Sequence, residues 1–268
     1  MRDCTPKPRG WTRYVVSCAV ACPAPGLLPA FFALFASLRL HSWADAMTAH
    51  FVNLLDGLRR RSLRMASQVE DVLQEACEAV FEPDEALARR VIARDDEVDA
   101  AEVEVETEVI RLLALYQPVG VDLRMLCTIL KVNNDLERIA DCAVNIAQRA
   151  RHLEVQRLAP QNEELRQLAP TVRRSLHDAI VAYGDSDAEA ARKVIDQDEA
   201  IDALYGQIIR NVAETKWSSE TIASALDLLS VAKNLERIAD HATNIAEDVI
   251  YLKTGTIVRH KPRTGPGT

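Results

Sequence analysis

The chain has 268 residues, of which 48% are hydrophobic and only 5% are aromatic. Its net charge of −8 excludes the class of nucleic-acid-binding proteins that rely on bulk electrostatic attraction, since these carry a positive surface. Ala, Leu, Val, Ile, Glu and Arg dominate, glycine is scarce, and no Gly or Asn turn lies between alternating apolar residues, so the composition favours helices over β-hairpins.

Residues 1–46 differ in composition from the rest of the chain. They carry five prolines, and five basic residues against two acidic ones. Two interpretations stay open: a secretory signal that is cleaved after Ala44-Asp45-Ala46, or a non-native segment with translation starting at Met47. We favour the second. The expected organisation is a non-homologous extension (1–46), a first bundle (47–156), a second bundle (157–254) and a loose tail (255–268).

The first half predicts three long helices and one short helix. Ten apolar residues from Phe51 to Val80 recur at helical spacing. Glu82-Pro83-Asp84 ends that first helix, and the Asp84 side chain can cap the short one. The expected helices are Thr48–Phe81, Glu85–Ala93, about Asp95–Tyr116 and about Val121–Leu153.

The second half repeats this pattern. The expected helices are Pro160–Ala182, a short Ala188–Ile195, Asp198–Ala213 and about Glu220–Leu252. Antiparallel helices joined by short loops pack as bundles. The predicted fold class is therefore all-α, with two tandem three-helix bundles related by internal duplication.

One twelve-residue motif occurs twice, 99 residues apart. LERIADCAVNIA at Leu136–Ala147 and LERIADHATNIA at Leu235–Ala246 differ at two positions. Each copy holds two acids four residues apart and an asparagine four residues later. Because residues at this spacing share one helix face, each half has two carboxylates and one carboxamide in a line.

The simplest interpretation of this acidic line is the solvated face of an amphipathic helix. Three observations favour a binding site. Like charges at this spacing repel, and Arg138 and Arg237 are expected off the acidic sector, so that neutralisation is incomplete. Each middle helix begins with a similar pair, and that end lies near the third helix if the bundle is antiparallel. Four carboxylates with a carboxamide form a hard oxygen site for Mg²⁺, Ca²⁺, Mn²⁺ or iron.

Several enzyme classes lack their signatures. A ferritin-type di-iron centre requires Glu-x-x-His, and no histidine here follows a glutamate by three residues. P-loop, GxSxG, HExxH and Rossmann glycine motifs are missing as well. Two alternatives stay open: a metal-dependent phosphohydrolase that uses the same carboxylates, and a metal-free helical adaptor. Arg59-Arg60-Arg61 with Arg64 form a basic patch, either a solvated face or a contact for an acidic partner.

The order of the motifs resembles the PhoU family, which accompanies the high-affinity phosphate ABC transporter. The stretches that carry the resemblance are Pro118–Arg124 (P-x-x-x-DLR), Asp135–Ala147 and Leu235–Glu247. The opening MTAHF at Met47 is also similar to the family's beginning, and the resemblance covers about 47–253. The chain departs from the family at Ala140 and Ala239, where glycine is usual, and at Cys142, where histidine is usual.

The resemblance implies metal clusters on the acidic pairs of each bundle. The implied ligands are Asp95, Asp99, Glu137 and Asp141 in the first half, and Asp198, Asp202, Glu236 and Asp240 in the second. The metal is divalent or trivalent, with iron, Zn, Mn, Mg and Ca as candidates. Auxiliary ligand candidates are Asn134, Asn145, Asn244 and His241.

The resemblance also implies a protein without catalytic activity. The expected partners are the ATPase of a phosphate ABC transporter and a phosphate-sensing histidine kinase, with no nucleic acid. The net effect is repression of phosphate-starvation genes when phosphate is plentiful. The widely spaced cysteines after residue 46 favour a reducing compartment, and we expect a cytoplasmic homodimer.

Overall fold

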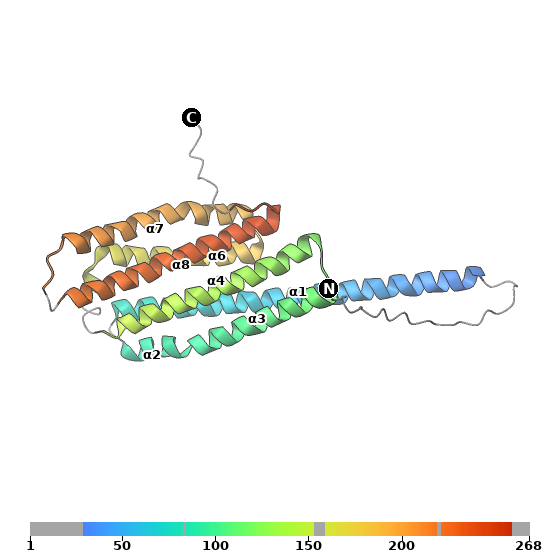
Figure 1. Cartoon of the computed structure of the whole chain (residues 1–268), viewed down its shortest axis with the longest axis horizontal. Coiled ribbons are helices and arrows are strands. Elements are labelled where there is room, and N and C mark those ends of the chain that lie inside the picture. Colours follow the sequence, from blue (N-terminus) through green and yellow to red (C-terminus); the bar gives the residue numbers. More distant parts are fainter. Residues whose placement is uncertain (1–28, 83, 153–158, 219–220, 259–268) are drawn as a thin grey trace, which may run out of the picture. The chain divides into compact units, whose positions relative to one another are not determined.

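The computed structural model describes residues 29–82, 84–152, 159–218 and 221–258 (Figure 1). The chain divides into two compact units, Met1–Thr48 and Ala49–Thr268. The second unit holds both predicted bundles, and all contacts given below lie within it. Most of the predicted extension (1–46) and of the predicted tail lies outside the described residues, apart from a helical backbone from Pro29 onward.

Helices make up both halves of the larger unit. The first half contains α1 (Pro29–Phe81), α2 (Glu85–Ala93), α3 (Asp95–Tyr116) and α4 (Gly120–Ala150). The second contains a short 3-10 turn, η1 (Ala159–Gln161), followed by α6 (Glu163–Asp185), α7 (Ala188–Glu214) and α8 (Ile222–Thr254). The described ranges contain no strand, so the all-α prediction of two three-helix bundles is confirmed. In the part of the chain that the structure describes, no helix is long and apolar enough to span a bilayer.

One predicted break in the second half is wrong. The sequence was expected to form Ala188–Ile195 and Asp198–Ala213 as separate helices, but α7 runs through both without interruption. Asp196-Gln197 contains neither proline nor glycine, so nothing in it stops a helix. The corresponding break in the first half is slight, because Arg94 between α2 and α3 keeps a right-handed helical backbone (φ −81°, ψ −7°).

The two halves pack against each other where α4 lies along α8. Within the halves, α3 packs on α4, and α6 and α7 pack on α8. α1 contacts α6 through a buried hydrogen bond between the hydroxyls of Ser62 and Tyr183, 3.0 Å apart. Figure 1 accordingly shows α3 and α7 on opposite outer sides, with α4 and α8 between them.

Candidate functional site

The start of α3 lies against the centre of α4, as the acidic-site hypothesis requires. Asp95 is partly buried, and burial raises the pKa of its carboxyl, with further upward contributions from the charges of Asp99 and Asp141. An effect of Asp141 on Asp95 means that carboxylates from two helices share one electrostatic environment. The structure therefore brings the predicted acidic pairs of the first half together.

Glu137 completes this first cluster. Its neighbours include Glu102, a residue that the sequence analysis did not single out. Burial raises the pKa of Glu137, the Asp141 charge raises it further, Arg138 opposes the rise, and Glu102 and Asp99 add to it. Burial and the charge of Glu106 also raise the pKa of Glu102. Glu102 follows Asp99 by three residues and so lies on the same face of α3. Extending the acidic line by one more helical turn would have found it.

The second half repeats the arrangement between α7 and α8. Burial raises the pKa of Asp240, and the charges of Glu236 and Asp198 raise it further; Lys233 opposes the rise and Asp202 adds to it. The other three acids predicted for this half therefore all act on Asp240.

Basic side chains partly neutralise both clusters. Arg138 forms ion pairs with Glu137 (Nε–Oε2, 3.1 Å) and with Asp141 (Nη1–Oδ2, 3.2 Å). Lys233 donates to Glu236 (Nζ–Oε2, 2.5 Å). From its position off the acidic sector, Arg138 reaches around the helix with its long side chain to both carboxylates, which the sequence analysis did not anticipate. Burial is the largest cause of the raised pKa values of Glu137 and Asp240, and the charges of Asp141 and Glu236 still add to them despite these basic partners.

Two of the auxiliary ligand candidates bond to a residue outside the clusters. His241 Nδ1 donates to Asp135 Oδ1 across the α4–α8 contact at 2.8 Å, and Asn244 Nδ2 donates to the same oxygen at 3.3 Å. Asn134 and Asn145 are exposed on α4. His241 and Asn244 therefore join the two halves of the molecule, and metal binding by these four residues stays a prediction.

The donor chemistry of both clusters fits a hard cation. Neighbouring carboxylates raise the pKa of Asp95 and Glu137 in the first cluster and of Asp240 in the second, and a bound cation would relieve this repulsion. Within the described part of the chain, however, no three Asp, Glu, His or Cys side chains are already grouped as a metal site. Binding would thus require the carboxylates to move closer together, and Arg138 and Lys233 to release those that they hold.

The basic patch on α1 contacts the chain itself. Arg59 donates to the carbonyl of Gly184 at the end of α6. Arg60 pairs with Asp56 (2.5 Å), and Arg61 pairs with Glu104 on α3 (2.9 Å). Arg59 and Arg61 therefore hold neighbouring elements, whereas Arg60 pairs within α1, and Arg60 and Arg64 are the exposed members of the patch.

Comparison with known proteins places these features in a family. The PhoU domain model matches twice, at residues 62–150 and 165–249. The phosphate-specific transport system accessory protein PhoU homolog of Pseudomonas aeruginosa is 35% identical, over 81% of this chain and 92% of the relative. Its Aquifex aeolicus counterpart is 37% identical, over 77% of this chain and 94% of the relative.

Solved structures agree with this assignment. The crystal structure of PhoU from P. aeruginosa superposes with a TM-score of 0.71 at 32% identity, covering 77% of this chain and 100% of that one. The phosphate transport system regulatory protein PhoU from Streptococcus pneumoniae superposes with a TM-score of 0.72 at 29% identity, covering 78% of this chain and 99% of that one. With both halves matched by sequence and by fold, the chain belongs to the PhoU family.

Proposed function

We propose that this chain is a non-enzymatic accessory regulator of a phosphate transport system. The observation that carries the proposal is the match of both halves to the PhoU domain, with an acidic cluster in each half. Relatives named as phosphate-specific transport system accessory proteins align over nearly their whole length. In this role a cytoplasmic homodimer contacts the ATPase of a phosphate ABC transporter and a phosphate-sensing histidine kinase, and represses starvation genes when phosphate is plentiful.

The acidic clusters are proposed to bind divalent or trivalent metal ions. In the first half Asp95, Asp99, Glu137 and Asp141 would hold the ion, with Glu102 as a further oxygen donor. Asp198, Asp202, Glu236 and Asp240 would hold it in the second half. A bound cation would pin the start of each middle helix to its neighbour and so fix the outer surface that a partner meets.

The competing proposal, a metal-dependent phosphohydrolase, needs a nucleophile or a proton-transfer group beside the carboxylates. The duplicated motif offers Cys142 in its first copy and His241 in its second. His241 is hydrogen-bonded to Asp135, and Cys142 is buried, which raises the pKa of its thiol. A thiol held protonated in this way is a poor nucleophile. Hydrolysis of a generic phosphate ester that Glu236→Gln abolishes would nevertheless establish the enzyme.

Metal binding is tested on untagged protein that is purified without chelator. Elemental analysis and calorimetric titration should find bound metal in the wild type, with loss of affinity in the double variant Asp141→Asn/Asp240→Asn. The control Asp56→Asn/Asp178→Asn removes two carboxylates outside the clusters and should bind like the wild type. Unchanged stoichiometry in the Asp141→Asn/Asp240→Asn variant would refute the ligand assignment.

The regulatory role is tested in the cell. Deletion of the gene should raise phosphate uptake and starvation-gene output in medium rich in phosphate, and the wild-type gene should restore repression. The double variant tells whether metal binding is needed for repression. Unchanged output after deletion would contradict the proposed role whatever the metal content.

A further inference from the structure

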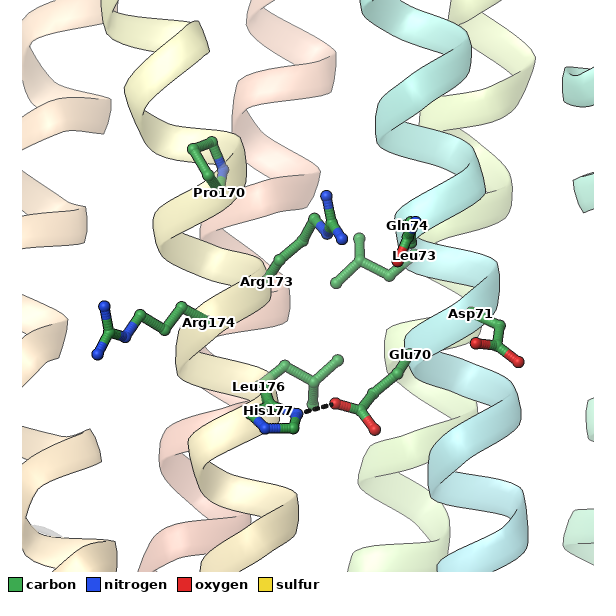
Figure 2. Close-up of a pocket in the computed structure, with 9 residues that line it drawn as sticks. All are labelled: Glu70, Asp71, Leu73, Gln74, Pro170, Arg173, Arg174, Leu176 and His177. Carbon is green, nitrogen blue, oxygen red and sulfur yellow. Dashed lines mark hydrogen bonds and ion pairs between the residues drawn. The ribbon is translucent and has the colours of Figure 1, made fainter.

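Two neighbouring hollows form a groove between α1 and α6, away from both acidic clusters. One has a volume of about 520 Å³ and is lined by residues from Glu70 to Gln74 and from Pro170 to His177 (Figure 2). The other, of about 400 Å³, is lined by residues from Cys77 to Glu82 and from Arg166 to Arg173. Pro170 and Arg173 line both hollows, so the two adjoin along the same pair of helices.

The two walls of this groove carry opposite charges. The α1 wall, with the turn that follows it, contributes Glu70, Glu78 and Glu82, and the α6 wall contributes Arg166, Arg173 and His177. The floor is apolar, and it consists of Leu73, Cys77, Phe81, Ala169 and Leu176. Asp71 on α1 and Arg174 on α6 also line the first hollow, and Figure 2 shows both side chains pointing outward. Each has the same sign of charge as the wall to which it belongs.

Arg173 is the central side chain of the groove. It is partly buried and reaches from α6 toward α1 in Figure 2, beside Leu73 and Gln74. Among the residues that the structure describes, its guanidinium forms no hydrogen bond or ion pair, although its charge acts on buried Cys77. The walls are bridged at one end by His177 and Glu70 (Nδ1–Oε1, 2.8 Å). A partly buried cation between two hollows is thus available to an incoming carboxylate.

The size and charge of the groove select one kind of occupant. From Glu70 to Glu82 it follows α1 for twelve residues, which at the helical rise is about 18 Å, or about three turns. Four carboxylates line the two hollows beside the basic groups, and they would repel a small free anion. An amphipathic helix satisfies all three surfaces at once, with its apolar face on the floor and charged edges of opposite sign against the two walls.

We propose that the α1–α6 groove docks an amphipathic helix of a partner protein, with the helix's acidic edge against Arg166 and Arg173 and its basic edge against Glu78 and Glu82. The inference deepens the proposed function and rests on it only for the identity of the partner. The docked helix lies across both halves of the chain, because α1 belongs to the first half and α6 to the second. Docking therefore responds to any change in how the halves pack.

The test uses three stapled fourteen-residue helical peptides, because unconstrained peptides of this length are marginally helical. All three carry leucines on one face. The mixed peptide has glutamates along one edge and lysines along the other, the acidic peptide has glutamates on both edges, and the basic peptide has lysines on both. Fluorescence anisotropy at low ionic strength should show the full-length chain binding the mixed peptide about tenfold more tightly than either of the others.

A charge reversal of one wall should switch this preference. In Arg166→Glu/Arg173→Glu both walls are acidic, so the basic peptide should become the tightest ligand by about tenfold. The control Arg192→Glu/Arg210→Glu makes the same change in net charge on exposed positions of α7 and should keep the wild-type order. Circular dichroism and thermal melting confirm that both variants are folded. Equal binding of the three peptides, or an unchanged order in Arg166→Glu/Arg173→Glu, would overturn the proposal.

Sedimentation separates a partner helix from a second copy of the chain. If the wild type self-associates and Arg166→Glu/Arg173→Glu abolishes this, the groove is an interface between copies and the proposal is wrong. Peptide binding is measured on the purified chain, so its failure is distinct from a failure of the phosphate role, which is scored by starvation-gene output in the deletion strain.

Discussion

Glu137 shows at the scale of one residue what the clusters do to the metal-free chain. Burial raises the pKa of its carboxyl above the ordinary value of 4.5, and the charges of Asp141, Glu102 and Asp99 add to this rise against the opposing charge of Arg138. A raised pKa means that ionisation of Glu137 is less favourable in the folded chain than in the unfolded chain. Without a cation the cluster therefore lowers the stability of the fold at neutral pH.

Glu137→Gln should stabilise the chelator-treated protein at neutral pH. Below 4.5 the residue is protonated in both states, and the variant should resemble the wild type. As pH rises through 4.5 and the raised folded pKa, the wild type loses stability relative to the variant, and above that range the difference is constant. Thermal melts from pH 4 to pH 8 measure this difference. In the presence of metal the order should reverse, because the variant lacks a ligand.

Glu108→Gln provides a control of opposite sign. The Arg111 side chain donates two hydrogen bonds to Glu108, and they hold the pKa of this carboxyl below 4.5. Its stabilising contribution is present above 4.5 and is lost as pH falls through the folded pKa, so Glu108→Gln should be less stable than the wild type at neutral pH. If both variants showed the same sign, the repulsion assigned to Glu137 would be wrong.

At the scale of the elements, a side-chain cap fixes where the short helix α2 begins. Asp84 Oδ1 accepts from the backbone N–H groups of Ala86 (2.9 Å) and Leu87 (3.0 Å). α2 has nine residues and buries Leu87, Ala88 and Val91 against the first bundle. A helix this short has little intrinsic stability, so its cap and its buried face decide whether it forms.

Asp84→Ala should lower the free energy of unfolding by about 1 kcal/mol, the usual effect of removing an N-cap. Asp84→Asn keeps the accepting oxygen without the charge and should remain close to the wild type. Chemical denaturation measures both, and hydrogen exchange at Ala86 and Leu87 locates the effect. Equal destabilisation by both substitutions would mean that the charge of Asp84 matters more than its hydrogen bonds.

Local patterns in the sequence predicted the elements better than the contacts between them. α2 and α3 have the predicted bounds because Pro83, Asp84 and Pro118 are strong local signals. The break within α7 was wrong because it was inferred by analogy with the first half and not from Asp196-Gln197 itself. The acidic pairs followed from helical spacing, but their meeting depends on helix packing, and the reach of Arg138 depends on its rotamer. The α1–α6 groove joins helices about a hundred residues apart, which no local pattern reports.

At the scale of the whole molecule, the duplicated motif plays a different part in each half. Asn244 and His241 on α8 donate to buried Asp135 on α4. Their counterparts in the first copy, Asn145 and Cys142, form no such pair: Asn145 is exposed and Cys142 is a buried thiol. The two copies have therefore diverged at the α4–α8 contact. The second copy supplies the donors His241 and Asn244, and the carboxylate comes from Asp135, which directly precedes the first copy.

This divergence offers a matched test of how far the halves depend on each other. Asn244→Ala removes a donor from a carboxylate that is only 6% exposed, so it should lower the free energy of unfolding by about 1 kcal/mol. Asn145→Ala is the same substitution at the repeat-related exposed position, and it should stay within about 0.5 kcal/mol of the wild type.

Calorimetry on the full chain then shows whether the two halves unfold together. Both faces of α4 and α8 are occupied, one by the helix's own bundle and the other by the opposite half, so separation would expose apolar surface on each. We expect one transition in the wild type, shifted downward by about 2–4 °C as a whole in Asn244→Ala. Two transitions, with Asn244→Ala moving only one of them, would mean that the bundles are independent domains, and that metal binding in one could not influence a partner docked across both.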